Sequence, residues 1–253
     1  MELSNKVCWV VGASSGIGAA VAHELLARGA RVAVSARRED ELQAVARGDM
    51  LAIGVDVTDK ESLQTAAGRV HDELGPIDLV ILSAGAWTQM DALHWDPDAF
   101  ATMVGVNVIG MSNAISAVLP DMLTRGSGVI AGIASVAGFR GLPGAEGYGA
   151  TKAAQINLLE SLRISVAPRG VRVTTICPGF VRTELTATNK FPMPFIIEAD
   201  AAARAICDGL QRDRTEIVFP APMAVLAKAA RLVPVGAWAS LWIRSARSKK
   251  EAS

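Results

Sequence analysis

The chain has 253 residues, of which 51% are apolar, so it carries enough apolar material for a full hydrophobic core. Its 25 Lys and Arg residues balance its 25 Asp and Glu residues. This balance excludes the basic footprint of a nucleic-acid-binding protein, and we expect no nucleic-acid partner.

Short apolar runs alternate along the chain with longer amphipathic patterns. Several runs are apolar on both faces, which is typical of strands inside a parallel sheet. We expect strands at Val7–Val11, Arg31–Ser35, Leu51–Val55, Leu79–Leu82, Gly128–Ile133, Val171–Cys177 and Glu216–Phe219. We expect helices at Ile17–Arg28, Glu39–Arg47, Lys60–Leu74, Pro97–Leu123, Tyr148–Ala167 and Ala199–Gln211. The alternation predicts one doubly wound, Rossmann-type α/β domain over residues 1–219, with about seven parallel strands flanked by helices, and a tail over residues 220–253.

A glycine-rich segment joins the first predicted strand to the first helix. It contains Gly12, Ser14, Ser15, Gly16, Ile17 and Gly18, with the spacing G-x-x-x-G-x-G. Glycines permit the close approach of a phosphate, and the helix N-terminus offers free N–H groups and a partial positive charge. The pattern alone also fits a turn that binds nothing, but its place at the first strand–helix junction favours a dinucleotide site.

The end of the second predicted strand indicates which dinucleotide. Arg37 and Arg38 stand where a carboxylate would bind a ribose 2′-hydroxyl, and Arg binds phosphate with two N–H groups. The pair therefore favours NADP(H), although two solvated arginines are the alternative. Asp56 and Val57 follow the third strand; Asp56 either accepts a hydrogen bond from adenine or caps the helix near Asp59.

Tyr148 and Lys152 lie one helical turn apart, so they share a face of the predicted helix. A phenol with its ordinary pKa of about 10 is a poor base, and a nearby ammonium favours the phenolate. The pair is a candidate general acid/base. Y-x-x-x-K is common on helices, but Tyr148 is the only tyrosine in the chain.

These motifs resemble, in order and spacing, the compact single-domain short-chain dehydrogenases/reductases, over roughly Ser4 to Phe219. Further matching positions are Ser83-Ala84-Gly85, Asn107, Ser135 thirteen residues before Tyr148, and Pro178-Gly179 with Thr183. The family usually has Asn where Ser83 stands, so we expect weaker bracing between strands there without an effect on proton transfer.

The resemblance implies an oxidoreductase that transfers a hydride between NADP(H) and a carbonyl or alcohol. Ser135 would bind the reacting oxygen, and Tyr148 would transfer the proton. Lys152 would bind the nicotinamide ribose and lower the pKa of Tyr148. Asn107 would anchor a water that links Lys152 to solvent. The remaining cofactor contacts implied are Ala84, Gly85, Pro178, Gly179, Thr183 and the backbone near Val181. A homodimer or homotetramer is also implied, through the predicted helices at Pro97–Leu123 and Tyr148–Ala167.

Apolar residues near these motifs predict a pocket for a hydrophobic ketone, aldehyde or secondary alcohol. They are Trp87, Phe139, Leu142, Pro143, Phe191, Met193, Phe195, Ile196 and Ile197. The alternative is that many of them form core or subunit contacts. Only Arg140 and Arg182 stand near enough in sequence to bind an acidic substrate. A non-catalytic NADP(H)-binding regulatory protein is the competing function; it predicts a damaged catalytic set, but Asn107, Ser135, Tyr148 and Lys152 are all present.

The tail after Phe219 is apolar and then basic. Trp238, Leu241 and Trp242 precede a cationic end at Arg244, Arg247, Lys249 and Lys250, and Pro234 is expected to break the segment. Such a segment either packs on the domain or a second subunit, or lies in a membrane interface.

The cysteines and the N-terminus indicate a reducing compartment. Cys8, Cys177 and Cys207 show no metal-ligand spacing, so no metal site is expected, and the N-terminus lacks a signal-peptide pattern. No stretch reaches the ~20 uncharged apolar residues of a membrane span. We therefore expect a cytoplasmic protein, with membrane association through the tail left open.

Overall fold

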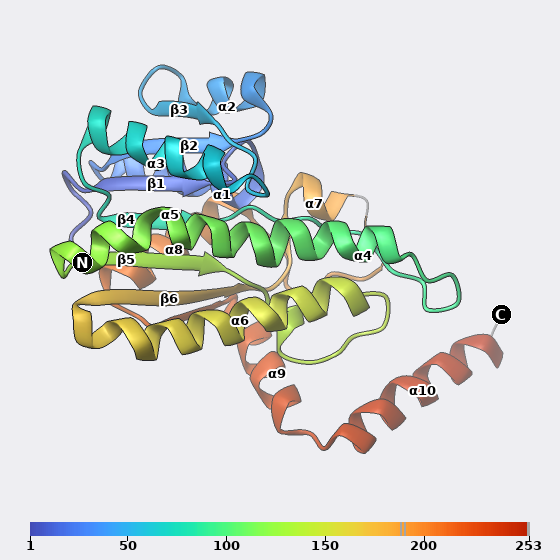
Figure 1. Ribbon diagram of the computed structural model, residues 1–253. Helices are drawn as coiled ribbons and strands as arrows, with labels where there is room; N and C mark the ends of the chain where they lie inside the picture. The colour runs from blue at the N-terminus through green and yellow to red at the C-terminus, as the bar shows by residue number, and fades with distance from the viewer. Residues whose placement is uncertain (188, 190, 252–253) are drawn as a thin grey trace.

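A parallel sheet forms the middle of three layers (Figure 1). The computed structural model describes residues 1–187, 189 and 191–251. The strands are β1 (Val7–Val11), β2 (Arg31–Ala36), β3 (Leu51–Gly54), β4 (Leu79–Leu82), β5 (Gly128–Ile133), β6 (Val171–Pro178) and β9 (Glu216–Phe219). Their order is β3-β2-β1-β4-β5-β6-β9, with every neighbouring pair parallel. The predicted doubly wound fold is confirmed, and each predicted strand lies within one residue of its observed bounds.

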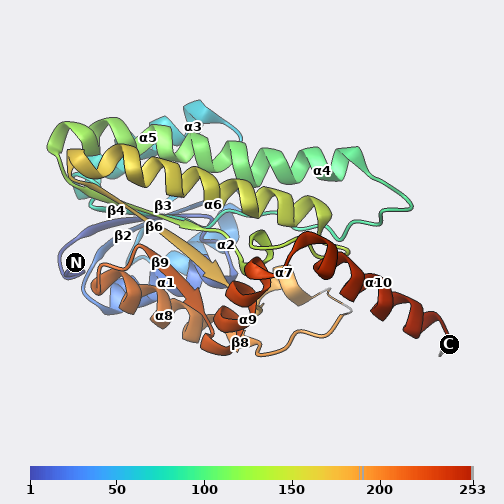
Figure 2. The same cartoon turned by 90° about the horizontal axis from the view of Figure 1, so that it is seen from below.

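Helices cover both faces of the sheet (Figure 2). One layer holds α1 (Gly16–Ala27), α2 (Glu39–Ala46) and α8 (Ala199–Gln211). The other holds α3 (Lys60–Leu74), α4 (Pro97–Val104), α5 (Gly110–Arg125) and α6 (Glu146–Val166). Alternate residues of β1 face the two layers: Cys8 and Val10 pack with the first, and Trp9 and Val11 with the second. Burial on both faces explains why the strand sequences are apolar throughout.

The helix predicted over Pro97–Leu123 contains a change of helical type. Gly105–Ile109 form the π-helical turn η1 between α4 and α5, and Asn107 lies on this turn. Turns of this kind inside α-helices often mark functional sites. The whole segment Pro97–Arg125 is long and apolar enough to cross a membrane, contrary to the sequence expectation. Its side chains Met103 and Met122 are fully buried, however, as in a helix that packs on a core.

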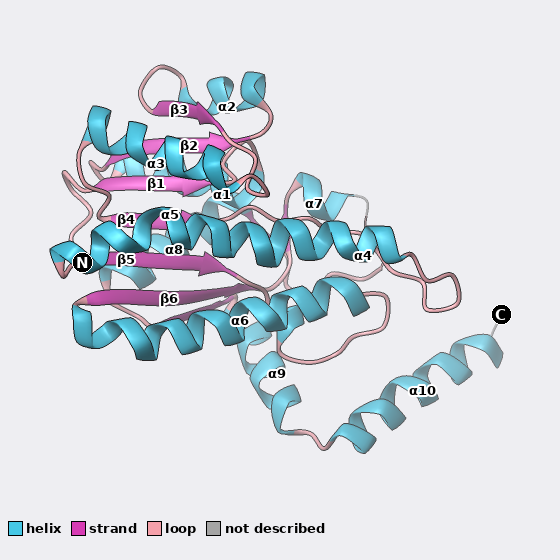
Figure 3. Ribbon diagram, in the orientation of Figure 1, coloured by secondary structure: helices cyan, strands magenta, loops and turns pink. Residues whose placement is uncertain are grey.

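Short elements and the tail complete the fold (Figure 3). The 3-10 turns η2 (Val136–Gly138) and η3 (Ala167–Arg169) flank α6, and β7 (Val181–Arg182) pairs with β8 (Ile197–Glu198) around the short helix α7 (Glu184–Ala187). The tail forms α9 (Ala221–Leu232) and α10 (Val235–Glu251), which meet at Pro234 with a bend of 117°. Helix α10 extends away from the body of the molecule (Figures 1 and 2).

Candidate active site

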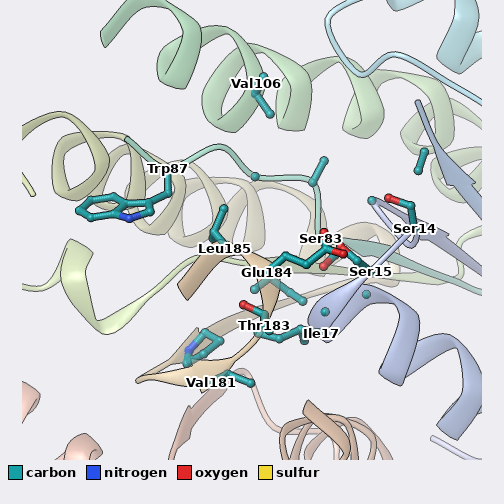
Figure 4. A pocket seen from close by; sticks show the side chains of 18 of the residues that line it. Ser14, Ser15, Ile17, Ser83, Trp87, Val106, Val181, Thr183, Glu184 and Leu185 are labelled. Carbon is teal, nitrogen blue, oxygen red and sulfur yellow. The ribbon is translucent and has the colours of Figure 1, made fainter. Parts of the chain in front are cut away.

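A cavity of about 520 Å³ opens at the carboxyl ends of the central strands (Figure 4). Its walls come mainly from the segments that follow β1, β2, β3, β4, β5 and β6. Strands β1 and β4 lie side by side at the point where the strand order reverses. In doubly wound sheets, this crossover point is where a crevice forms and a nucleotide binds.

The glycine segment forms the floor of this cavity beneath the N-terminus of α1. Gly12 has φ +89°, and a Cβ there would overlap the backbone of Ala84. A Cβ on Gly18 would overlap the carbonyl oxygen of Gly12. Helix α1 begins at Gly16, so its free N–H groups face the cavity together with the hydroxyl groups of Ser14 and Ser15. The backbone geometry therefore fits a phosphate group.

Arg37 and Arg38 both line the cavity, but they differ in their contacts. Arg37 is exposed. Arg38 donates to the hydroxyl groups of Ser14 (3.2 Å) and Ser15 (2.9 Å), and it forms ion pairs with Glu41 (2.7 Å) and Glu184 (3.0 Å). Glu184, on α7, brings a negative charge to this cavity.

Asp56 does not line the cavity, although its neighbour Val57 does. One carboxylate oxygen of Asp56 accepts hydrogen bonds from the backbone N–H (2.9 Å) and hydroxyl (2.8 Å) of Thr58. These bonds hold the pKa of Asp56 below its ordinary value. Asp59, and not Asp56, caps α3, accepting from the N–H groups of Glu61 and Ser62.

Ser135, Tyr148 and Lys152 are brought together on one wall of the cavity. Ser135 follows β5, and its hydroxyl oxygen accepts the N–H of Ala137 at 3.1 Å. Burial raises the pKa of Tyr148 to about 12, while its hydrogen bond with Ser135 acts in the opposite direction. The phenol is therefore neutral across the physiological range in this environment.

The expectation that Lys152 lowers the pKa of Tyr148 is not met in the structure. The Nζ atom of Lys152 donates to Gln155 Oε1 (2.8 Å) and to the carbonyl oxygen of Ile133 (3.0 Å), and it lies 5.4 Å from the centroid of the Tyr148 ring. Burial also lowers the pKa of Lys152 to about 7. A half-neutral amine engaged with other acceptors stabilises a phenolate weakly.

Asn107 lies behind the cavity wall and is fully buried. Its side-chain oxygen accepts the N–H of Ala86 (2.7 Å), and its amide nitrogen donates to the carbonyl oxygen of Ala86 (3.0 Å) and to Thr151 Oγ1 (2.9 Å). The side chain thus joins the segment after β4 to α6. Its backbone carbonyl accepts Gln155 Nε2 at 2.5 Å.

The residues predicted to contact the nicotinamide end of the cofactor lie together in the cavity. Ala84, Gly85, Pro178, Gly179, Val181 and Thr183 all line the cavity, as predicted contacts for the cofactor. Val181 lies on β7, and Thr183 lies between β7 and α7, next to the glycine segment (Figure 4). The N–H of Ser83 donates to the carbonyl oxygen of Val11 at 2.8 Å, so β1 and β4 remain joined beyond the glycine segment.

The predicted apolar pocket is formed only in part. Trp87 lines the cavity, whereas Phe191 and Phe195 are partly exposed and absent from its walls. Phe139 is buried beneath the guanidinium of Arg231, 5.1 Å away. Leu142, Pro143, Met193, Ile196 and Ile197 also lie outside the cavity walls.

The two cations considered for an acidic substrate are engaged elsewhere. Arg140 donates to the carbonyl oxygen of Val233 in the tail at 2.7 Å, and Arg182 pairs with Glu198 at 2.9 Å. Neither side chain lines the cavity. The structure therefore gives no support to a role for either arginine in binding substrate.

Sequence reasoning missed part of the site. The further lining residues are Ala36, Val55, Ser83, Val106, Ile133, Ala134, Glu184, Leu185 and Thr186. Several of them lie at strand ends, one position from a predicted contact, so the predicted strand ends could have identified them. Gln155 had a weaker signal: it is a polar residue three positions after Lys152, on the buried side of the same helix.

Comparisons with known proteins identify the family and the fold. The sequence profile of the short chain dehydrogenase family matches residues 6–192. An uncharacterized oxidoreductase of Myxococcus xanthus is 40% identical over 240 residues, covering 92% of this chain and 94% of its relative. A short-chain dehydrogenase from Streptomyces avermitilis superposes with a TM-score of 0.82 at 29% identity, covering 97% of this chain and 98% of that one. A short chain dehydrogenase from Burkholderia cenocepacia, solved in complex with NADP, superposes with a TM-score of 0.81 at 28% identity, covering 92% of this chain and 100% of that one.

The fold and the cavity thus define a nucleotide-binding Rossmann-type oxidoreductase. The chain belongs to the short chain dehydrogenase family.

Proposed function

We propose that this protein interconverts a carbonyl and an alcohol with NADP(H), and that Tyr148 transfers the proton. The observation that carries this proposal is the meeting of Ser135, Tyr148 and Lys152 in one cavity whose floor is the glycine segment and the N-terminus of α1. A phosphate-binding floor beside a proton-transfer group is the arrangement that hydride transfer needs.

The residues present fit a nicotinamide dinucleotide. The glycine segment and α1 would hold its phosphates, and Thr183 with the backbone at Val181 would hold its carboxamide end. Lys152 would contact the nicotinamide ribose. When bound, the cofactor supplies or accepts the hydride. Trp87 and Leu185 give that end of the cavity an apolar wall.

Proton movement in the proposed reaction belongs to the protein. In reduction, Ser135 donates a hydrogen bond to the carbonyl oxygen, and the Tyr148 hydroxyl gives its proton to the same atom. The phenolate that remains is stabilised by its hydrogen bond with Ser135 and only weakly by Lys152, whose Nζ atom lies 5.4 Å from the ring centroid. The role implied for Asn107, as the anchor of a water that links Lys152 to solvent, stays a prediction. Through Ala86 and Thr151 its side chain also fixes the position of α6 against the segment after β4.

NADP(H) is the proposed cofactor because Arg37 and Arg38 stand at the carboxyl end of β2, where a 2′-phosphate would lie. The neighbour from Burkholderia cenocepacia was solved with NADP, which supports the proposal. Tighter binding of NADPH than of NADH, measured by titration, is the expected result.

A panel of carbonyls and alcohols, read by NADPH absorbance, tests the activity. Trp87 and Leu185 favour a hydrophobic ketone, aldehyde or secondary alcohol. The competing function is a regulatory protein that binds NADP(H) without turnover. Binding of NADPH with no turnover across the panel would favour that competitor, whereas turnover of any member excludes it.

Two further proposals concern partners. Ile109 on η1 and Ile164 on α6 are exposed apolar residues on the helices that the resemblance assigns to subunit contacts, and we infer a homodimer or homotetramer through this face. Light scattering at micromolar concentration tests it, and a monomeric mass would contradict it.

The tail supports the second proposal, of peripheral membrane contact from the cytoplasmic side. Val235, Leu241, Trp242 and Ile243 are exposed on α10, and the exposed Arg244 follows them. The side chains of Arg247, Lys249 and Lys250 lie outside the described part of the structure. An apolar, tryptophan-bearing helix with cationic residues suits an anionic membrane interface. Flotation with anionic liposomes at low salt tests this contact.

A further inference from the structure

Gln155 connects two residues of the proposed catalytic set. It is fully buried on α6, three positions after Lys152. Its Oε1 atom accepts from Lys152 Nζ at 2.8 Å, and its Nε2 atom donates to the backbone carbonyl of Asn107 at 2.5 Å. The amide has one usable orientation, because the reverse would face its N–H₂ group to an amine donor and its oxygen to a carbonyl.

We propose that Gln155 is a positioning residue, whose side-chain amide holds Lys152 in place and favours its charged form by linking it directly to the backbone of Asn107. This inference rests on the proposed function. The resemblance to known dehydrogenases places a water molecule between Asn107 and the lysine; in this chain the link is a side chain that cannot exchange with solvent.

The anchor of this link is rigid. Asn107 lies on the π-helical turn η1, and its own side chain is fixed by Ala86 and Thr151. Gln155 is therefore held at its far end by the backbone carbonyl of Asn107, a residue whose own position is constrained. Lys152 Nζ has three N–H groups when charged; Ile133 and Gln155 take two, and one is left for the cavity that Lys152 lines.

The charge of Lys152 depends on few groups. Tyr148 lies on the same helix and Cys177 on β6, and burial raises the pKa of both to about 12, so both are neutral near pH 7. Burial itself disfavours the ammonium. In the described part of the chain, the oxygen atoms of Gln155 and of Ile133 are the acceptors that Lys152 Nζ contacts. Loss of either acceptor removes a charge-assisted hydrogen bond from a buried cation.

Two substitutions change this link in opposite directions. Gln155→Met keeps the length and volume of the side chain but removes the acceptor, so the pKa of Lys152 is expected to fall further. Gln155→Glu places a carboxylate beside Nζ, so the pKa of Lys152 is expected to rise. The pKa is read from the ¹³Cε chemical shift of Lys152 in protein labelled with ¹³C-lysine, assigned by its loss in Lys152→Met. This readout needs neither cofactor nor substrate.

Catalysis provides the second readout. In Gln155→Met, kcat for carbonyl reduction at pH 7 is expected to fall about tenfold or more, with KM nearly unchanged, because the lost bond is to a charged group. Leu159→Met is the matched control: it is a volume-conserving change of a buried residue on the same helix, and it leaves both the pKa and kcat as in the wild type. If Gln155→Met does not fold, Gln155→Asn, which is too short to span both partners, replaces it.

Opposite shifts in the pKa of Lys152 with a loss of kcat in Gln155→Met support the proposal. An unchanged pKa in both variants, or wild-type kcat with an altered pKa, overturns it. The two proposals fail in different ways. Absence of turnover in the wild type counts against the reductase, whereas the lysine titration reports on Gln155 in either case.

Discussion

The indole of Trp87 meets the ring of Tyr148 edge-on, with centroids 5.1 Å apart and an interplanar angle of 77°. Trp87 also donates from Nε1 to Asn189 Oδ1 at 3.0 Å, so it is fixed between the segment after β4 and the segment after α7. The indole therefore packs against the ring of the proposed catalytic phenol. Burial is the main cause of the raised pKa of Tyr148, which connects Trp87 to the acidity of that group.

Trp87→Ala should lower the pKa of Tyr148 from about 12 towards the ordinary phenol value of about 10, since it admits water to the ring. Tyr148 is the only tyrosine, so tyrosinate absorbance in the near ultraviolet reports this one group. Trp95→Ala is the control, because Trp95 is half exposed and stacks on Phe100. An identical alkaline titration in both variants would show that Trp87 does not shield the phenol.

Tyr148→Phe should strongly slow carbonyl reduction while leaving the fold and NADPH binding intact. The substitution removes one hydroxyl but keeps the ring that packs on Trp87. Loss of a general acid is expected to cost about 10²–10⁴-fold in kcat. Steady-state kinetics and a fluorescence titration with NADPH check the two halves of this prediction. Near wild-type kcat in a variant that binds NADPH normally would remove Tyr148 from the mechanism.

Arg37→Ala should weaken the binding of NADPH by about tenfold or more and the binding of NADH much less, since only NADPH carries the 2′-phosphate.

Glu184→Gln should tighten the binding of NADPH, because it releases Arg38 from the ion pair across the cavity and removes a negative charge from the site. Arg182→Ala, which breaks a pair outside the cavity, is the control. Equal losses for both cofactors in Arg37→Ala would be inconsistent with a 2′-phosphate contact.

Features of this structure were predictable from the sequence when they depend on residues close together along the chain. Strands such as Val7–Val11 were predicted to the residue, because burial on both faces leaves a continuous apolar run. The glycine segment and the cavity position were predictable from local spacing and from strand order. These features depend on neighbours in sequence or on the general rules of parallel sheets.

Pairings between distant residues were not predictable. Arg140 bonds to Val233, 93 residues away, and Arg38 pairs with Glu184, 146 residues away; neither leaves a periodic signal. The sequence pattern predicts an ordinary helix where the π-helical turn at Asn107 lies. For the same reason, the sequence led us to expect that Lys152 lowers the pKa of Tyr148, whereas in the structure the Nζ atom of Lys152 donates to Gln155 and Ile133.

Lys152 should make stability depend on pH. The pKa of Lys152 is about 7 in the folded chain, against an ordinary value of 10.5. Above pH 7 the unfolded chain therefore binds more protons than the folded chain. The free energy of unfolding then rises with pH, by at most about 1.4 kcal/mol per pH unit. The buried thiols Cys8, Cys177 and Cys207 have pKa values raised from 9.0 to about 12, and above pH 9 they act in the opposite direction. The rise is therefore confined to about pH 7 to 9.

Lys152→Met should remove this rise, whereas Lys60→Met, at an exposed lysine, should retain it. Denaturant unfolding of the three proteins across the same pH range gives the comparison. Parallel stability curves for wild type and Lys152→Met would mean that Lys152 is charged in the folded chain at pH 8.

Two truncations should separate the roles of the tail helices. Helix α9 buries Met223 and Ala227, and its Lys228 pairs with Glu216, so a chain ending at Pro220 should be less stable and less soluble. A chain ending at Pro234 loses only α10, whose described contacts with the domain include the bond from Trp238 to the carbonyl oxygen of Gly141 (2.8 Å).

The chain ending at Pro234 should therefore melt within a few degrees of the full-length protein, bind NADPH normally and lose binding to anionic liposomes. Thermal unfolding and flotation, run on both truncations and on the full chain, distinguish these outcomes. If full-length protein does not float at low salt, α10 has no membrane role. If instead removal of α10 changes the mass measured by light scattering, its exposed apolar face packs on a second subunit.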